Sequence, residues 1–361
     1  MECGTQSMKV PADTLKQFVE QLFRACQLSE EDARLCAEMI VLQEMRGVKT
    51  HGLRRVGPNL DGLTKGQMNP RPNRQVLRDE TATVVLDGDH GVGMLGCMDA
   101  MNRAIQKAKS CGIGIGIVVR NNHFLSAAPY CLRAVEEGMI GICCSNTYGS
   151  MGYPGTHARA IANSPLGFGV PTSDGFPIVF DAALTTSGGK LSQWIREGKR
   201  IPPALLGVDA KGTPSEDPQA VLHGGTPWPI GDYKGAGLAI LVEVLTGVLG
   251  GGGFLHGVVA PEARTSKENA ESQCCIALDV AHFLSLDAFH DRMSAFLSDL
   301  KNNPLAPGHD EILLPGERAD RSLQDCAQNG VQIEPDVKEE LRHWALLLKV
   351  PSERIFESLN C

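Results

Sequence analysis

The sequence predicts an α/β fold in which helical segments at both ends of the chain flank a central region of strands and helices. Apolar residues recur at helical spacing over residues 11–46 and again over residues 336–349. From Thr81 onward the pattern changes to short apolar runs typical of buried strands, such as Ile113–Val119. A chain of 361 residues is long enough for one large or two ordinary domains with a sizeable core.

The N-terminal part predicts two amphipathic helices within residues 11–46. Ser29 can cap the second helix, because Asp32 follows three residues later as in a capping box. Gly47 is expected to end that helix. Residues 58–75 are rich in Pro, Gly and Asn, and they predict a connection between domains.

The remaining elements follow from changes in the hydrophobic period. Strands are predicted at residues 81–86, 113–119, 139–145, 176–181 and 274–278. Helices are predicted at residues 91–110, 126–137, 235–249, 283–302 and 336–349. Residues 258–273 contain a polar stretch, and residues 315–318 predict a loop.

Charge and hydropathy exclude several classes of partner. The formal net charge is -8, and no run of Lys and Arg is long enough to neutralise a nucleic-acid backbone. No apolar run is long enough to span a bilayer, and Met1–Gly4 does not begin a signal peptide. We therefore expect a cytoplasmic protein that acts on small molecules rather than on nucleic acid or membranes.

The 12 cysteines lie scattered in apolar contexts, without a C-x-x-C pair or the spacing of a zinc site. The adjacent pairs Cys143-Cys144 and Cys274-Cys275 fall in runs that resemble strands. The expected state is reduced thiols, with no metal site.

Gly91–Gly96 matches the G-x-G-x-x-G pattern of dinucleotide-binding turns, between a predicted strand and a predicted helix. Three features argue against that interpretation. Asp87–His90 places acidic groups where a pyrophosphate would be repelled. The next strand ends in Arg120-Asn121, without an acid for the ribose, and the upstream segment is helical. A Rossmann site is therefore not favoured.

His123 follows the predicted strand Ile113–Val119 and is the best candidate for a group that exchanges a proton near neutral pH. A histidine bonded only to backbone or solvent is the alternative. Thr50-His51-Gly52 with Arg55 suits recognition of a carboxylate, because arginine offers two parallel N–H donors. A solvated basic loop is the alternative there.

Lys234 stands at the start of a predicted apolar helix. A lysine and free backbone N–H groups at a helix start can hold a phosphate or pyrophosphate. An ordinary loop lysine explains the same residues equally well.

Taken in order, these stretches resemble the type-2 malate/L-lactate dehydrogenases. That family also includes ureidoglycolate and sulfolactate dehydrogenases, diketogulonate reductase and cyclic-imine-2-carboxylate reductases. The resemblance runs from Thr14 to Val350. It rests on Arg46–Gly52 with Arg55, Asp87–Gly93, Asn122–Phe124 with Ala127, Ala128 and Tyr130, Ser164-Pro165, Gly189-Lys190, Asp232–Leu238 and Leu314–Arg318.

The resemblance implies a non-Rossmann fold. Residues 76–304 would form an NAD(P)-binding domain on a largely antiparallel or mixed sheet. Residues 1–75 and 305–361 would form a helical, substrate-side domain packed with it. The family further implies a homodimer that transfers a hydride between NAD or NADP and a malate- or lactate-like 2-oxo or 2-hydroxy acid.

The resemblance also implies a role for individual residues. His123 would donate or accept the proton, with Thr50 and His51 as a relay or orienting pair. Arg55 would hold the substrate carboxylate, and Asn163 would lie on the substrate side. The cofactor would contact Ala127, Tyr130, Asp181, Lys190, Lys234, Pro315, Gly316, Glu317 and Arg318.

Two departures from the family pattern stand out. Leu125 occupies the position of a glycine immediately after His123-Phe124, and residues 181–190 deviate before Gly189-Lys190. These departures leave two alternatives open. One is a cyclic-imine-2-carboxylate reductase, and the other is a catalytically weakened relative that binds a dinucleotide or a partner.

Overall fold

The computed structural model describes residues 9–173, 175–187, 189–260, 263–264, 270–352 and 355. The chain forms two compact units. The helical unit comprises Met1–Pro72, Thr172–Ile178 and Asp287–Cys361, and the sheet unit comprises Asn73–Pro171 and Val179–Leu286. Residues 287–304, expected in the domain of the strands, group with the helical unit. Met1–Gly4 and part of the predicted polar stretch 258–273 lie outside the described residues.

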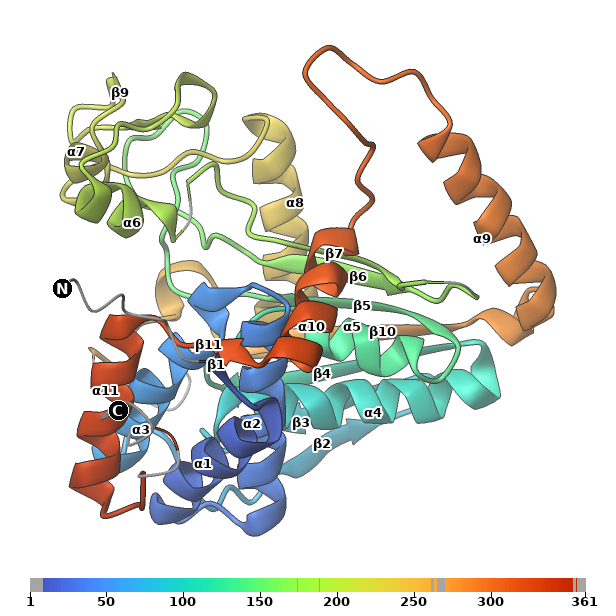
Figure 1. Cartoon of the computed structure of the whole chain (residues 1–361), viewed down its shortest axis with the longest axis horizontal. Helices are drawn as coiled ribbons and strands as arrows, with labels where there is room; N and C mark the ends of the chain where they lie inside the picture. Colours follow the sequence, from blue (N-terminus) through green and yellow to red (C-terminus); the bar gives the residue numbers. More distant parts are fainter. Residues whose placement is uncertain are drawn as a thin grey trace, which may run out of the picture. The chain divides into compact units, whose positions relative to one another are not determined.

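The helical unit joins the two ends of the chain. Strand β1 (Lys9–Val10) pairs antiparallel with β11 (Val331–Gln332). The helices are α1 (Ala12–Ala25), α2 (Glu30–Met45), α3 (Val56–Thr64), α9 (Leu286–Lys301), α10 (Glu317–Asn329) and α11 (Pro335–Leu348) (Figure 1). Two 3-10 turns, Lys49–His51 and Leu53–Arg55, connect α2 to α3.

Most predicted helices of this unit are confirmed, and the errors have local causes. The Ser29 hydroxyl accepts a hydrogen bond from the Asp32 N–H at 3.1 Å, which confirms the predicted cap. Helix α3 was predicted as a connection, yet Leu60 and Leu63 are buried along it. The predicted loop at 315–318 is only half a loop, because Glu317 begins α10.

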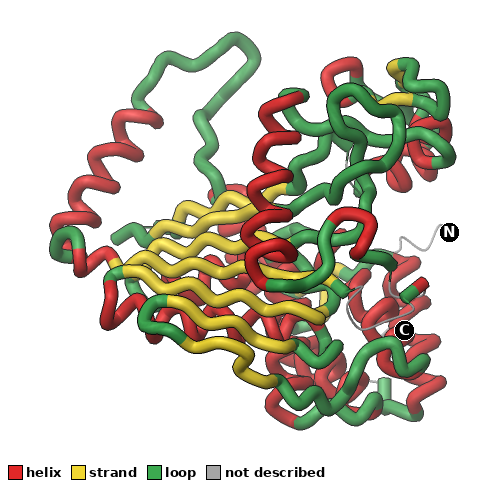
Figure 2. Tube along the Cα trace, turned by 180° about the vertical axis from the view of Figure 1, so that it is seen from behind, coloured by secondary structure: helices red, strands yellow, loops and turns green. Residues whose placement is uncertain are grey.

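The sheet unit is built on a seven-stranded mixed sheet of order β2-β3-β4-β10-β5-β6-β7 (Figure 2). Its strands are β2 (Gln75–Asp79), β3 (Thr83–Asp87), β4 (Ile113–Asn121), β5 (Met139–Ser145), β6 (Leu166–Val170), β7 (Ile178–Ala182) and β10 (Glu271–Asp279). Strands β3 and β4 run parallel, whereas the pairs β2–β3, β4–β10, β10–β5 and β5–β6 are antiparallel. The predicted mixed, largely antiparallel sheet is confirmed; β2 and β6 were not predicted.

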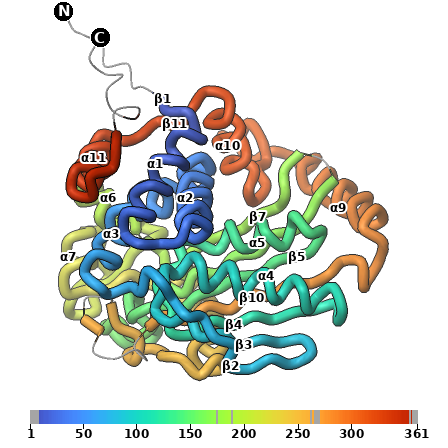
Figure 3. The backbone as a smooth tube through the Cα atoms, turned by 90° about the horizontal axis from the view of Figure 1, so that it is seen from below, coloured from blue at the N-terminus to red at the C-terminus, as the bar shows by residue number. Residues whose placement is uncertain are grey.

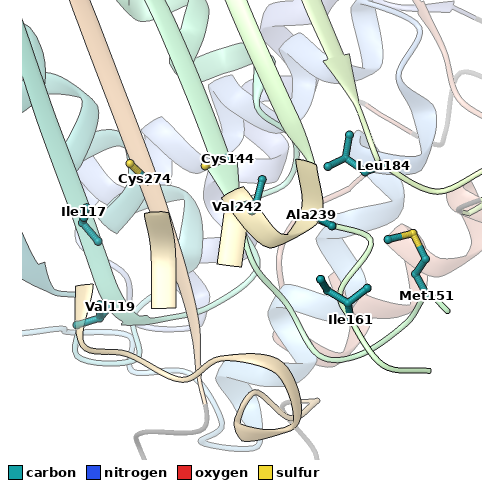
Figure 4. Close-up of a cluster of buried hydrophobic side chains, with 9 residues drawn as sticks. All are labelled: Ile117, Val119, Cys144, Met151, Ile161, Leu184, Ala239, Val242 and Cys274. Atoms are coloured by element: carbon teal, nitrogen blue, oxygen red, sulfur yellow. The ribbon is translucent and has the colours of Figure 1, made fainter. Parts of the chain in front are cut away.

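Helices cover the two faces of this sheet differently. Helices α4 (Gly93–Cys111) and α5 (Ala128–Val135) pack side by side on one face (Figure 3). Helix α8 (Tyr233–Glu243) and the π-helical turn Val244–Val248 approach the other face. The core on that side contains Ile117, Val119, Cys144, Met151, Ile161, Leu184, Ala239, Val242 and Cys274 (Figure 4).

A small lobe of the sheet unit holds α6 (Lys190–Glu197), α7 (Pro218–Leu222) and the hairpin β8 (Gly207–Val208) with β9 (Pro214–Ser215). Its core is Leu191, Ile201 and Val221. Among the described residues, no helix has the length and apolar character required to cross a membrane.

Candidate active site

The segment that carries His123 leaves the end of β4 on a base of buried amides. The Asn121 side chain donates a 2.7 Å hydrogen bond to Gln273 Oε1 on β10. Gln273 in turn donates to Ser145 Oγ on β5 at 3.0 Å. Because all three polar side chains are buried, breaking one bond would leave an unsatisfied polar group in the core. The network therefore holds the backbone before His123 in one position.

The Gly91–Gly96 motif packs against this segment rather than forming a phosphate cradle. A Cβ at Gly93 would lie 2.1 Å from the Asn122 carbonyl oxygen, so only glycine allows the approach. The Asn122 side chain donates to the Gly91 carbonyl at 2.8 Å, and its own oxygen accepts from Arg264. This packing explains the motif without a nucleotide. The contact with Arg264 has no signal in the sequence, since the partners are 142 positions apart.

The ring of His123 has a defined hydrogen-bond partner. The backbone N–H of Leu125 donates to His123 Nδ1 at 3.1 Å. Nδ1 is therefore an acceptor, and the neutral imidazole carries its proton on Nε2. Leu125 has a φ of 73°, which is unusual for a branched residue, and its side chain is only 1% exposed. The side chain that replaces the expected glycine thus points into the protein interior.

Three predicted cofactor residues stabilise the loop after His123. Tyr130 is fully buried, stacks on Phe124 at 5.5 Å between ring centroids, and donates to the Phe124 carbonyl. Ala127 is also fully buried. Asp181 on β7 accepts a 2.9 Å hydrogen bond from the Ala128 N–H at the start of α5. Contact of Ala127, Tyr130 and Asp181 with a cofactor stays a prediction.

In the helical unit, the structure brings Thr50, His51 and Arg55 together on consecutive 3-10 turns. Thr50 Oγ1 and His51 Nδ1 share a hydrogen bond of 2.8 Å. Burial, assisted by the positive charge of Arg55, lowers the pKa of His51 to about 4. His51 is consequently neutral at pH 7 and suited to orienting or relaying rather than carrying charge.

Arg54 and Arg55 have different surroundings although they are adjacent. Arg54 forms ion pairs with Glu334 and with Asp336, the latter at 2.7 Å, at the start of α11. Its guanidinium is therefore used within the fold. Arg55 contributes its positive charge to the electrostatic environment of His51, and its contact with a substrate carboxylate stays a prediction.

Gly52, between these turns, is required by a close approach to α2. A Cβ at this position would lie 2.3 Å from Glu44 Oε2. Glu44 is buried and accepts a 2.9 Å hydrogen bond from the Leu53 N–H. This contact places the turn that bears His51 directly over the end of α2.

Two predicted cofactor-binding lysines lie in the first turns of helices of the sheet unit. Lys190 begins α6 and Lys234 is the second residue of α8, and both side chains are exposed. Within the described ranges, neither lysine forms an ion pair. Asn163 is half-buried, and its backbone carbonyl accepts from the Leu184 N–H at 2.7 Å. The site role of each residue stays a prediction.

The predicted cofactor loop Pro315–Arg318 divides into buried and exposed parts. Glu317 is buried and binds Lys301 at 2.7 Å and Arg321 at 2.6 Å. These bonds give Glu317 a role inside the fold. Pro315 and Arg318 are exposed, and Gly316 is half-buried with a φ of 93°.

The mixed sheet and its glycine-rich turn define a non-Rossmann α/β protein, with a proton-exchange candidate at the end of a central strand. Residues 10–342 match the family model described as malate/L-lactate dehydrogenase. The chain belongs to this family, as the sequence motifs predicted.

Relatives with different named reactions share most of this chain. The malate dehydrogenase of Pyrococcus abyssi is 31% identical over 348 residues, covering 94% of each protein. The Delta(1)-pyrroline-2-carboxylate/Delta(1)-piperideine-2-carboxylate reductase of Pseudomonas putida is 29% identical, covering 68% of this chain and 72% of the reductase. The crystal structure of malate dehydrogenase from Entamoeba histolytica superposes with a TM-score of 0.90 at 29% identity, covering 96% of this chain and 99% of that one.

Proposed function

We propose that this protein is a nicotinamide-dependent oxidoreductase that interconverts a 2-oxo acid and the corresponding 2-hydroxy acid, of malate or lactate type. The observation that carries the proposal is His123, held after β4 by a buried hydrogen-bond network in a chain of this family. A hydride transfer to a carbonyl needs one proton donor close to the carbonyl oxygen, and a positioned histidine supplies that function.

The exposed residues of the sheet unit fit a dinucleotide. Lys190 and Lys234 place positive charges beside the N-termini of α6 and α8, where backbone N–H groups also attract phosphate oxygens. When bound, NAD(H) or NADP(H) supplies or accepts the hydride. The chain itself contributes phosphate-binding charges and the groups that hold and protonate the acid.

In the reductive direction, hydride arrives at the carbonyl carbon and the carbonyl electron pair moves to the oxygen. His123 then donates the proton that converts this oxygen to a hydroxyl. In the oxidative direction the same ring accepts that proton at Nε2, which requires the neutral tautomer that carries its proton on Nδ1 instead of accepting the Leu125 N–H there. Arg55 holds the carboxylate through paired N–H donors and thereby fixes the face that is attacked. Thr50 and neutral His51 orient the acid or relay a proton.

The Leu125 hydrogen bond also favours a second candidate, a reductase of cyclic imine carboxylates. With Nδ1 occupied as an acceptor, a neutral His123 presents an N–H rather than a lone pair at Nε2. An imine substrate that arrives already protonated needs no proton from this ring. A 2-oxo acid, in contrast, requires a ring protonated on both nitrogens, which displaces the Leu125 N–H from Nδ1.

A substrate panel separates the two candidates. Purified protein is assayed for NADH and NADPH oxidation with oxaloacetate, pyruvate and a cyclic imine carboxylate. His123→Ala should reduce turnover of the 2-oxo acids by about 10²–10⁴-fold but that of the imine far less. His282→Ala removes an exposed histidine after β10 and is the control. Cofactor binding without turnover on the whole panel would contradict both candidates and favour a non-catalytic relative.

We also propose that the protein is a homodimer. Helix α8 and the π-helical turn after it carry a row of exposed apolar residues at helical spacing. They are Leu238, Leu241, Val244 and Val248. A continuous apolar stripe on one helix is a common feature of subunit interfaces, and a second copy of this chain is the partner that the family supports.

A further inference from the structure

Three thiols that are remote in the sequence meet inside the sheet unit. Cys97 comes from α4, Cys143 from β5 and Cys275 from β10. The Sγ–Sγ distances are 3.7 Å for Cys97–Cys143, 3.6 Å for Cys97–Cys275 and 3.7 Å for Cys143–Cys275. All three residues are completely buried. These residues are called the thiol triad below.

The pairing of β5 with β10 explains how the triad forms. Cys143 lies directly opposite Cys275, and Cys144 lies directly opposite Cys274. Because side chains alternate along a strand, the two pairs point to opposite faces of the sheet. The first pair faces α4, where Cys97 completes the triad. The second pair belongs to the apolar core on the α8 side (Figure 4).

The triangle of sulfur atoms has the dimensions of a metal site. Zinc–sulfur bonds of about 2.3 Å in a tetrahedron place neighbouring sulfurs about 3.8 Å apart. The observed distances of 3.6–3.7 Å lie close to this value. A disulfide would need sulfurs about 2.05 Å apart, so the three thiols are free. Cys131 on α5 interacts electrostatically with Cys97 and Cys275 and is a further buried thiol in the surroundings of the triad.

The chemistry of the triad selects a soft cation. Thiolates prefer Zn²⁺ and related soft ions, whereas Mg²⁺ and Ca²⁺ require oxygen ligands. Burial raises the pKa of the Cys97 and Cys143 thiols, whereas hydrogen bonds from these two neighbours lower the pKa of Cys275 despite its own burial. A divalent ion with two thiolates and one thiol is electrically neutral, which suits a buried site.

We propose that Cys97, Cys143 and Cys275 form a binding site for a soft divalent cation of the Zn²⁺ type. Loss of two thiol protons gives two metal–thiolate bonds, and the third sulfur binds the ion through a lone pair as a neutral thiol, without oxidation or reduction. A bound ion would connect α4 to both strands. Since the first turn of α4 packs on Asn122, just before His123, occupancy would stabilise the base of the candidate active site.

Cadmium is a suitable probe, because its bonds to thiolates absorb in the ultraviolet. Reduced full-length protein is titrated with Cd²⁺, and it is also purified from cells grown with added Cd²⁺, since buried sulfurs are most accessible during folding. We expect one tightly held ion per chain that survives brief exposure to a chelator. Two protons should be released on binding. The thermal midpoint should rise by roughly 3–8 °C at a hundredfold excess over the dissociation constant.

Two double variants of the same strands provide a matched comparison. Cys143→Ala/Cys275→Ala removes two sulfurs of the triad, and Cys144→Ala/Cys274→Ala removes the equivalent pair from the opposite face. The first variant should lose the bound ion and the ultraviolet absorption of the cadmium–thiolate bonds, while the second variant retains both. Circular dichroism of each variant shows whether it has folded. Equal binding by both variants, or no retained ion by either loading route in the unmodified protein, would overturn the proposal.

Discussion

The backbone N–H of Leu125 donates a hydrogen bond to Nδ1 of His123 at 3.1 Å, and Leu125 adopts a φ of 73° to do so. A leucine in this left-handed region is strained by about 1–2 kcal/mol, which a glycine would avoid. The side chain compensates because it is buried. Strain and burial therefore oppose each other at the residue that orients the candidate proton donor.

Substitution of Leu125 should show both effects. Leu125→Ala loses buried surface and keeps the strain, so the free energy of unfolding should fall by about 2–5 kcal/mol. Leu125→Gly should be more stable than Leu125→Ala by about 1 kcal/mol. At Leu22, in the interior of α1, the order should reverse because glycine is the poorer helix former. Urea unfolding of the four variants shows whether the Ala or the Gly variant is more stable at each site. An Ala variant that is more stable than the Gly variant at both sites would contradict the strain at Leu125.

The neighbouring arginines should separate stability from activity. Arg54→Ala removes the ion pairs to Glu334 and Asp336 and should lower the free energy of unfolding by about 1–3 kcal/mol with little change in substrate KM. Arg55→Ala should lower kcat/KM for a 2-oxo acid by about 10–100-fold, as expected for lost charge-assisted bonds to a carboxylate. Steady-state kinetics and urea unfolding of both variants test this division. The reverse result would reassign the carboxylate to Arg54.

Much of the fold was predictable because the spacing of apolar and polar residues along the sequence reflects which side chains are buried. The strand Ile113–Val119 is confirmed within β4, and Ser29 caps α2 as expected. Helix α3 was missed because Pro58 and two glycines are poor helix formers. Burial of its apolar face in the folded chain overrides that local preference, and a local pattern does not report it.

The sequence predicted which residue types form the candidate site, but not which residues each of them contacts in the folded chain. The sequence places two arginines side by side, and only the folded chain shows that Arg54 binds Glu334, 280 positions away. The same holds for the thiol triad, whose members are separated by up to 178 positions. Spacing rules detect ligands on one turn or hairpin, so a site assembled from a helix and two strands escapes them.

The low pKa of His51 predicts a loss of stability in mild acid. Its folded pKa is about 4, whereas the unfolded value is about 6.5. Above pH 6.5 both states are neutral at this group. Between pH 6.5 and 4 only the unfolded state binds the proton, so stability should fall by up to about 1.4 kcal/mol per pH unit. His51→Gln should lack this component. Unfolding curves of both proteins at pH 4.5 and 7.5 measure this loss of stability. An equal loss of unfolding free energy in the two proteins would exclude His51 as its source.

Glu317 and Arg318 should behave differently although both belong to the predicted cofactor loop. Glu317→Gln weakens the ion pairs of the buried Glu317 with the exposed side chains of Lys301 and Arg321 and should cost about 1–2 kcal/mol of stability. Arg318→Gln changes an exposed side chain, so unfolding should change by less than about 0.5 kcal/mol. If Arg318 contacts the dinucleotide, its variant raises the KM for NADH or NADPH. An unchanged KM for both cofactors would remove Arg318 from the site.

The exposed apolar row on α8 makes the proposed dimer testable. Leu241 is 49% exposed, and at a twofold interface each substitution acts in both subunits. Leu241→Asp should therefore weaken association by several kcal/mol, a change of at least about a thousandfold in the dissociation constant. Light scattering after size exclusion should show a dimer for the unmodified protein and a monomer for this variant. Leu346→Asp, on the exposed side of α11, is the control that should stay dimeric. Burial of this apolar row is the reason to expect association. A Leu241→Asp variant that remains dimeric would therefore place the interface elsewhere. An unmodified protein that is monomeric would contradict the dimer itself.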